Sequence, residues 1–349
     1  MKRLITIMAA VAALLAVASC GNKTKKVLMP NISGKAGEVI VVIEKNEWNG
    51  AVGTALRETL EDECPYLPQP EPMYNLIDVV PSGFKTMFQV HRNIIMVNID
   101  PSVTEPGVKY RKDVWAAPQC VIWINAADSE SAVELFKENS KTIIAYLDQA
   151  ERDRVIMNAK RYEEIKLAPV VAQLAGGSPH FPSGYKLKKN TEDFIWITYR
   201  PQYVDQSILI YKYPVVEGEN MLDLDNILEK NAEVLKENVP GMFENTWMMT
   251  SPVIKPEVQY LSYKGRAFAE VRGLWEVHND YMGGPFVLHA FYSQDGKDVI
   301  VLEAFVYAPK YDKRQYLRQV ESVIYSFEWA KPEVSASEDV EKSKNILSK

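Results

Sequence analysis

The second half of the chain places its strand-forming segments in long runs, with one helix between two of these runs. Strands are expected near 185–188, 194–200 and 207–213, and the second and third of these segments are rich in the β-branched and aromatic residues that favour strands. An amphipathic helix over about 222–238 follows, then five further strand segments and a closing helix near 313–326. Strands that do not alternate with helices exclude a doubly wound nucleotide-binding fold. They predict an α+β fold whose mainly antiparallel sheets pack against helices.

The order of elements in this half also resembles a known architecture. The five later strands are expected at 247–251, 258–264, 267–278, 286–292 and 298–307. Three strands, a helix, a five-strand meander and a final helix form an order similar to the PsbP/Mog1-type sandwich, which serves in binding and scaffolding. The resemblance implies an α/β/α sandwich for the C-terminal half and brings no catalytic residues with it.

The first half mixes strands and helices. Residues 38–43 form an apolar, β-branched run that predicts a buried strand, and a helix is expected over about 50–63. Every second residue of the segment 67–72 is proline, so this segment must be extended. Asp128 caps a long helix that continues to about Lys166. Further strands are expected near 75–80, 84–90, 94–99, 110–116 and 119–125.

The chain is long enough for two hydrophobic cores. Residues 168–184 are rich in Gly, Ser and Pro, a composition that predicts a linker. The expected domains are therefore 34–167 and 185–330. A polar tether is expected at 20–33, and a charged, disordered tail at 331–349.

The first twenty residues predict the protein's destination. Residues 1–3 include two basic side chains, and residues 4–17 form an apolar run too short to span a bilayer. The run ends in Val-Ala-Ser before Cys20, which resembles the bacterial lipobox. We therefore expect a lipoprotein signal peptide at 1–19 and a lipid on Cys20. An ordinary signal peptide followed by a chance cysteine is the alternative.

The residues after the lipidation point refine the location. Gly21 and Asn22 provide no Asp of the kind that retains some lipoproteins in the inner membrane. Lys23, Lys25 and Lys26 stand where surface-exported lipoproteins carry acidic residues. These patterns favour the outer membrane, with the protein facing the periplasm and held to the membrane by its lipid. The lysines either contact anionic headgroups or belong to a plain solvated tether.

Charge and cysteine content narrow the possible partners. The formal net charge is −6, and removing Lys2 and Arg3 with the signal peptide makes it −8. No basic stripe offsets this charge, which excludes nucleic acid as an expected partner. Cys64 and Cys120 could form a disulfide in an oxidising periplasm. Because Cys120 lies in an apolar strand segment, a buried free thiol is equally compatible with the sequence.

Several sequence blocks together resemble one family. They lie at 37–57, 67–72, 91–94, 272–275 and 283–286. In combination they are similar to a domain-of-unknown-function family of lipoproteins from Bacteroidota, over nearly all of the mature chain. The resemblance implies lipidation and periplasmic exposure. It implies no cofactor and no catalytic residue.

Residues 272–286 contain the densest group of polar and aromatic side chains. Alternate residues of a strand share a face, so Arg272, Glu276 and His278 are expected on one side and Trp275 on the other. This pattern is typical of a strand with one wet and one buried face. These four residues are the candidate ligand-binding side chains of this segment.

A metal site at the same place is not expected. His278 and Asp280 could be two ligands, with His289 as the third. A turn at 281–285 places His289 on the opposite face of the sheet from His278, where it is a core residue. The two glycines of this turn are expected to supply a positive φ.

The remaining search for chemistry is negative. The sequence has no G-x-S-x-G, H-E-x-x-H, P-loop or G-x-G-x-x-G motif. Arg92 and Asn93 could bind an anionic ligand, or Arg92 could form a structural ion pair. We expect a binding or scaffold protein of the cell envelope with a protein or glycan partner, without cofactor, metal or catalysis. The alternative is a hydrolase or carbohydrate-binding accessory that uses residues 272–286.

Overall fold

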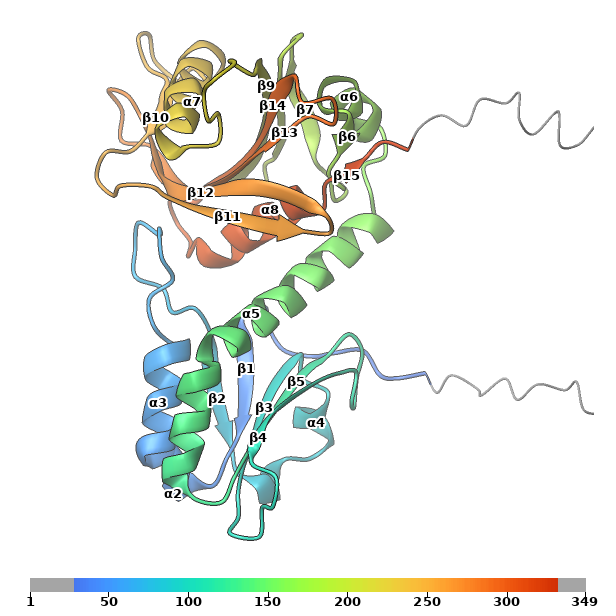
Figure 1. Cartoon of the computed structure of the whole chain (residues 1–349), viewed down its shortest axis with the longest axis vertical. Coiled ribbons are helices and arrows are strands. Elements are labelled where there is room, and N and C mark those ends of the chain that lie inside the picture. Colours follow the sequence, from blue (N-terminus) through green and yellow to red (C-terminus); the bar gives the residue numbers. More distant parts are fainter. Residues whose placement is uncertain (1–27, 332–349) are drawn as a thin grey trace, which may run out of the picture.

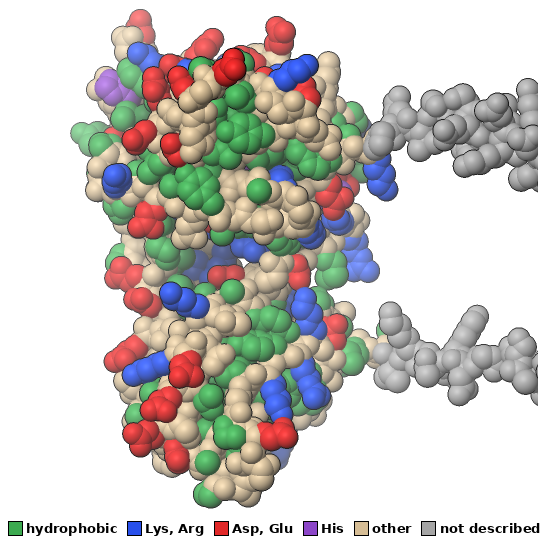
Figure 2. Space-filling view, in the orientation of Figure 1, with side chains coloured by type: hydrophobic (Ala, Val, Ile, Leu, Met, Phe, Trp, Pro, Cys, Tyr) green, Lys and Arg blue, Asp and Glu red, His purple; other side chains and the backbone are tan. Residues whose placement is uncertain are grey.

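The computed structural model describes residues 28–331, which form two domains joined by one long helix (Figure 1). The predicted signal peptide, Cys20 and nearly all of the predicted tail lie outside these residues. Within the described range, no helix combines the length and apolarity needed to cross a membrane. The space-filling view shows a narrow waist between the domains, with Lys and Arg side chains inside it (Figure 2).

The N-terminal domain is built on a five-stranded sheet of order β2-β1-β3-β5-β4. Its strands are β1 (Glu38–Val42), β2 (Asn75–Val79), β3 (Asn93–Ile99), β4 (Gly107–Lys112) and β5 (Cys120–Ala126). β1 pairs in parallel with β2 and β3, and β3 pairs in parallel with β5, whereas β4 is antiparallel to β5. The predicted α+β class is confirmed for the chain, but this sheet is mainly parallel. Helical segments between its strands allow the chain to return in the same direction.

Helices cover one face of this sheet. The short α2 (Lys45–Asn49) leads into α3 (Ala51–Leu60), which packs beside the first half of α5 (Ser129–Arg161) over the sheet. Val39, Val41, Leu56 and Phe136 are among the core residues of this face. On the opposite face, Phe84, Phe88, Trp115 and Trp123 pack around a smaller cluster that includes Ile40 and Ile94.

Helix α5 connects the two domains. The predicted cap is confirmed, because the Asp128 carboxylate accepts a hydrogen bond from the Ser131 backbone N–H at 2.8 Å. In return, the Ser131 hydroxyl accepts a hydrogen bond from the Asp128 backbone N–H at 3.3 Å. Ile143 and Leu147 belong to the N-terminal core. Ile156, two turns and a half further on, belongs to a core of the C-terminal domain. One helix is therefore shared by both domains (Figure 1).

The C-terminal domain contains an eight-stranded antiparallel sheet. Its order is β10-β12-β13-β14-β9-β8-β7, with β11 also paired to β12. The strands are β7 (Lys186–Asn190), β8 (Phe194–Tyr199), β9 (Asp205–Pro214), β10 (Met248–Thr250), β11 (Glu257–Tyr263), β12 (Arg266–Val277), β13 (Gly283–Tyr292) and β14 (Asp298–Tyr307). All eight strands overlap segments that the sequence predicted as strands, and most of them carry apolar, β-branched or aromatic residues.

Helices lie on both faces of this sheet. α6 (Leu167–Ala175) and α8 (Arg314–Tyr325) cover one face, where Ile208, Val287 and Leu302 lie in the core. α7 (Leu224–Asn238) covers the other face and packs onto a core that includes Leu209 and Leu288. The central strands therefore alternate between two buried surfaces, whereas β7 and β11 are largely exposed. The sheet has little wet surface, and the expected solvent-facing side of β12 is covered.

The predicted linker at 168–184 is wrong. Helix α6 occupies its first half, and Val171 and Phe181 are buried in the C-terminal core. β6 (Gly177–Ser178) pairs with β15 (Glu328–Trp329). Gly176 ends α6 with φ +66°, the left-handed conformation that glycine adopts without strain. The glycines therefore mark a helix end and a close strand pairing.

Two further segments differ from the prediction. Residues 84–90 form α4 (Thr86–Gln89) after the short 3-10 helix η1 (Pro81–Gly83), where a strand was expected. The described end of the predicted tether is attached to the N-terminal domain, because Asn31 bridges Ala117 and Ser33 bridges His91. The tether residues pair with segments distant in the chain, which their own sequence does not reveal.

Candidate functional site

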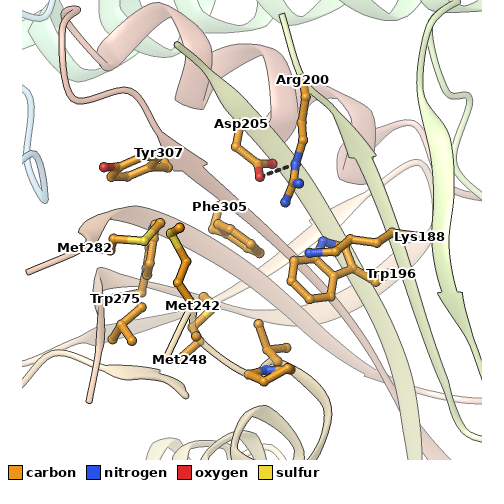
Figure 3. A pocket seen from close by; sticks show the side chains of 14 residues that line it. Lys188, Trp196, Arg200, Asp205, Met242, Met248, Trp275, Met282, Phe305 and Tyr307 are labelled. Carbon is orange, nitrogen blue, oxygen red and sulfur yellow. Dashed lines mark hydrogen bonds and ion pairs between the residues drawn. The ribbon is translucent and has the colours of Figure 1, made fainter. Parts of the chain in front are cut away.

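A cavity of about 220 Å³ lies in the C-terminal domain, between the face of the sheet covered by α7 and the loop that follows α7 (Figure 3). Strands β7, β8, β9, β10, β12 and β14 contribute to its walls. Its lining comprises Lys188, Trp196, Arg200, Asp205, Val239, Pro240, Gly241, Met242, Met248, Trp275, Val277, Met282, Phe305 and Tyr307. Aromatic and methionine side chains form most of this surface, and three charged side chains stand on one side.

The apolar wall is held in place by aromatic packing. Trp275 meets Phe305 edge to face, with ring centroids 5.2 Å apart, and its indole N–H donates to the Val306 carbonyl at 3.2 Å. Trp196 packs against Phe305 from the other side, with centroids 6.3 Å apart. The three rings come from β8, β12 and β14, where alternate residues face α7. Met248 and Met282 complete the wall with unbranched side chains that adapt to irregular ligands.

Asp205 organises the polar wall. Its carboxylate accepts hydrogen bonds from the hydroxyls of Thr198 at 2.8 Å and Ser207 at 2.6 Å, and from Nε of Arg200 at 2.6 Å. The Ser207 hydroxyl also accepts the indole N–H of Trp196 at 3.0 Å. A continuous hydrogen-bond network therefore fixes the Trp196 ring and the base of the Arg200 guanidinium.

Lys188 reaches the cavity because of a β-bulge. Leu187 pairs with Ile197 and Lys189 with Trp196, so Lys188 is the extra residue in β7. A bulge changes the direction of a side chain relative to its strand. The Lys188 ammonium lies 3.2 Å from the centroid of the Trp196 ring. Partial burial, together with the like charge of Arg200, lowers the pKa of Lys188 to about 8.

The loop after α7 forms the mouth of the cavity. A Cβ on Gly241 would lie 2.2 Å from the Thr246 hydroxyl, so only glycine allows the two segments to approach this closely. The Thr246 hydroxyl donates to the Phe243 carbonyl at 2.6 Å and holds the loop closed. Met242 lines the cavity and is 77% exposed, and Phe243 beside it is 67% exposed. The apolar wall thus extends outward to solvent.

Of the residues expected to bind a ligand, Trp275 lines the cavity. Arg272 and Glu276 lie on the opposite face of β12, as the alternation predicted. Arg272 is bonded to Glu270 at 2.7 Å and Glu321 at 2.8 Å, and these two carboxylates hold its pKa above the usual range. Glu276 accepts a hydrogen bond from the Ser251 hydroxyl at 2.6 Å. The side chains of Arg272 and Glu276 therefore hold β12 against neighbouring segments of the same domain.

The predicted turn is placed differently in the structure. Glu276 pairs with Gly283, and Trp275 pairs with Gly284, so the turn precedes both glycines. Asn279 provides the positive φ of this turn, at +59°. Gly284 is needed for another reason, since a Cβ there would lie 2.1 Å from the Val306 carbonyl oxygen. The expected requirement for left-handed glycines at this point is wrong.

His278 and His289 do not come together as metal ligands. His278 follows β12 and stacks on Trp247, with ring centroids 4.1 Å apart. His289 is fully buried, as predicted, but on the Arg272 face of the sheet, where it pairs with Glu270 at 3.1 Å. Burial lowers the pKa of His289 to about 4, which leaves it neutral. Within residues 28–331, no three His, Cys, Asp or Glu side chains are grouped to hold a metal ion.

Arg92 and Asn93 are part of a buried network within the N-terminal domain. Arg92 forms an ion pair with Glu151 at 2.9 Å. Asn93 donates to Glu151 at 2.8 Å and to the Glu38 carbonyl at 2.9 Å, and accepts from Arg154 at 3.0 Å. These contacts attach β3 to α5. Of the two roles expected for Arg92, the structure therefore supports the structural ion pair and not the binding of an anionic ligand.

Cys64 and Cys120 are free thiols, so the possible disulfide between them is not formed. Cys120 is buried in β5, and burial raises the pKa of its thiol to about 12. Cys64 lies at the edge of the C-terminal core. Each packs as a small apolar side chain in a different core.

The sequence contains only weak signals for the cavity residues that the sequence analysis did not identify. Lys188 is one of three closely spaced lysines, and nothing local shows that β7 bulges there. Arg200 and Asp205 flank a short turn between two strands, a pattern shared with many surface ion pairs. Met242, Met248 and Met282 are scattered along the chain. Only their convergence in the fold reveals a shared site.

Each domain of the chain matches a family model that is described only as a domain of unknown function. Residues 167–326 match the Domain of unknown function (DUF4837), and residues 32–160 match the Domain of unknown function (DUF8532). The family boundary at residue 167 coincides with the start of α6, in agreement with its place in the C-terminal core. No curated protein matches the chain.

Two solved structures show distant similarity. LpqN, involved in cell envelope biogenesis of Mycobacterium tuberculosis, is 15% identical, with a TM-score of 0.26, over 42% of this chain and 81% of that one. The lipid transfer and protein localization domain of human StarD13 (DLC2) is 12% identical, with a TM-score of 0.21, over 42% of this chain and 89% of that one. Both TM-scores are too low to support a shared fold or function.

Proposed function

We propose that this protein is a lipid-anchored binding protein of the cell envelope, and that its C-terminal cavity holds an amphiphilic small molecule. The cavity itself is the observation that carries the proposal. It is walled by Trp196, Trp275 and Phe305, and charged side chains stand at one side. Ligand sites are typically concave and mostly apolar, with a few placed polar groups.

The size and composition of the cavity support binding of an apolar group. Its volume of about 220 Å³ exceeds that of an engineered apolar cavity of about 150 Å³ in another protein, which binds benzene. Met242, Met248 and Met282 line it, and methionine side chains accommodate ligands of varied shape. The hydrogen-bond network around Asp205 holds the polar side in place before a ligand arrives.

The proposed location follows from the N-terminal sequence. Cys20 ends a lipobox-like junction after an apolar run, which supports attachment of a lipid. Gly21, Asn22 and the lysines after them favour the outer membrane and a periplasmic orientation. The likeness to Bacteroidota lipoproteins agrees with a lipid anchor, and the PsbP/Mog1-type order of elements agrees with a binding role. A protein or glycan partner of the envelope remains part of this proposal.

Two experiments test the proposal. Cells that express wild type or Cys20→Ala are labelled with an alkyne fatty acid; we expect label on the wild type alone, and equal label on both would contradict the anchor. Protein lacking residues 1–20 is then titrated with single-chain amphiphiles that carry bromine on the chain. Saturable, one-to-one quenching of tryptophan fluorescence is expected, because Trp196 and Trp275 line the cavity.

A further inference from the structure

We infer that the cavity selects amphiphiles with an anionic head, held between Lys188 and Arg200, while the chain lies against Trp196, Trp275 and Phe305. This inference rests on the proposed function and adds the chemical class of the ligand. Four features of the described residues support it.

The first feature is the position of the Lys188 ammonium. The bulge in β7 directs it over the Trp196 ring, at 3.2 Å from the ring centroid. Within residues 28–331, Lys188 forms neither an ion pair nor a side-chain hydrogen bond. Here the strand is distorted and the ammonium rests on an aromatic face, with its donors available to a ligand.

The second feature is the unused part of the Arg200 guanidinium. Its Nε donates to Asp205 at 2.6 Å, whereas neither terminal nitrogen has a hydrogen-bond acceptor among the described residues. Figure 3 shows the terminal nitrogens and the Lys188 ammonium pointing into the same space, next to the Phe305 ring. A guanidinium fixed at Nε presents its other donors in a set geometry, which suits an anionic oxygen.

The third feature is an excess of positive charge. Lys188 and Arg200 contribute two charges, and Asp205 is the acidic side chain of the lining, so the local sum is +1 in a chain of net charge −6. Asp205 forms an ion pair with Arg200 at 2.6 Å and offsets one of the two positive charges. The lowered pKa of Lys188 agrees with this imbalance, because burial and the charge of Arg200 both disfavour its ammonium. An anionic head would relieve it.

The fourth feature is the shape of the remaining space. A volume of about 220 Å³ corresponds to roughly seven water-sized groups at about 30 Å³ each. The head and the first part of a chain fill this space. The exposed side chains of Met242 and Phe243 continue the apolar surface outward, where the rest of a longer chain would lie. The cavity therefore suits a single chain of medium length.

The test compares four ligands that share an eight-carbon chain: octanoate, octyl phosphate, octanol and octyltrimethylammonium. Binding to protein lacking residues 1–20 is measured by isothermal titration calorimetry at pH 7. We expect octanoate and octyl phosphate to bind at least ten-fold more tightly than octanol, and octyltrimethylammonium to bind most weakly. The ratio of octanoate to octyl phosphate distinguishes a carboxylate from a phosphate head.

Variants then locate the selectivity. Lys188→Gln and Arg200→Gln should each weaken octanoate binding about ten-fold and leave octanol binding within two-fold. Lys186→Gln, on the same strand but outside the cavity lining, should change neither. The substituted side chains are all exposed, and thermal unfolding of each variant verifies that the fold is retained.

The outcomes separate the two proposals. Equal affinity for octanoate and octanol, or an equal loss of both in Lys188→Gln, would overturn the anionic selectivity and leave the binding function standing. Tighter binding of octyltrimethylammonium would also overturn it. Absence of binding for all four ligands would overturn the proposed function and this inference together.

Discussion

Glu71 in the N-terminal domain caps the last helix of the C-terminal domain by accepting the backbone N–H of Lys313 at 2.6 Å. Its second carboxylate oxygen accepts the N–H of Arg314 at 3.0 Å. Helix α8 has no capping hydrogen bond from its own N-cap side chain. Glu71 is only 6% exposed, and its charge lies at the positive end of the helix dipole. The proline-rich connector thus completes a helix more than two hundred residues away in the chain.

Ion pairs between α5 and α8 complete the contact between the domains. Arg152 bonds to Glu321 at 3.0 Å, and Arg318 bonds to Asp148 at 3.2 Å. Gln315 donates to the Ala36 carbonyl at 2.8 Å. Partly buried charges must keep their partners, because an unpaired charge there is costly. This requirement defines how one domain sits on the other.

Replacing Glu71 should therefore loosen α8 and the contact between the domains. Glu71→Ala leaves two N–H groups at the start of α8 without an acceptor, and we expect it to lower the free energy of unfolding by about 1–3 kcal/mol. Urea denaturation measures the change, and hydrogen exchange at the first turn of α8 should become faster. Glu63→Ala, at an exposed position just before this connector, is the matched control. Equal stability of the two variants would argue against the cap.

Glu303 should make stability depend on pH. It is fully buried beneath α7, and burial raises its pKa to about 8, although Asn231 donates to it at 2.6 Å. The folded state keeps this proton up to about pH 8, whereas the unfolded chain releases it near 4.5. The contribution of the Glu303 carboxyl to the free energy of unfolding is therefore complete below about pH 4.5. It is lost by up to about 1.4 kcal/mol per pH unit as pH rises toward 8.

Glu303→Gln removes this titration and retains an acceptor for Asn231. We expect the variant to gain stability relative to wild type between pH 5 and pH 8, as measured by urea denaturation at several pH values. Glu229→Gln, on the exposed side of α7, should follow the wild type. A constant difference between wild type and Glu303→Gln across this range would contradict a buried, protonated carboxyl.

Trp275 and His278 should differ strongly in their contribution to stability. Trp275 is buried against Phe305 and Tyr307, so Trp275→Ala should cost roughly 3–5 kcal/mol. His278 lies in a turn, and the variant His278→Ala would lose only the stacking on Trp247. We therefore expect it to lower the free energy of unfolding by no more than about 1 kcal/mol. Chemical denaturation compares them. Near-native stability of Trp275→Ala would show that the aromatic wall does not support this domain.

Residues 167–185 should resist proteolysis. Val171, Leu174 and Phe181 are buried in the C-terminal core, whereas residues 216–220 are exposed throughout. Brief digestion with a broad-specificity protease such as subtilisin should cut in 216–220 first, as read by mass spectrometry of the fragments. A first cut within 167–185 would restore the linker interpretation. Val171→Asp, which places a charge in the core, should open this segment to cleavage.

Much of the local structure could be predicted from the sequence. Strands β8, β9, β12, β13 and β14 follow from runs of β-branched and aromatic residues, and helix α7 follows from a helical period, because these patterns report which side chains are buried. The cap at Asp128 is also local, since donor and acceptor lie three residues apart. The alternation around Trp275 correctly separated its face from that of Arg272. Local patterns of this kind do not depend on which distant segment supplies the other half of the core.

The candidate site depends on the tertiary structure instead. Lys188, Phe305 and Met242 belong to separate segments, and they meet because β14 and β8 both pair with β9 and the loop after α7 closes over the sheet. The bulge at Lys188 and the cap from Glu71 arise from pairings that leave no local mark. Hydrophobic periodicity states that a residue is buried. Strand order, register and the approach of distant loops decide what it is buried against, and these depend on the packing of the whole chain.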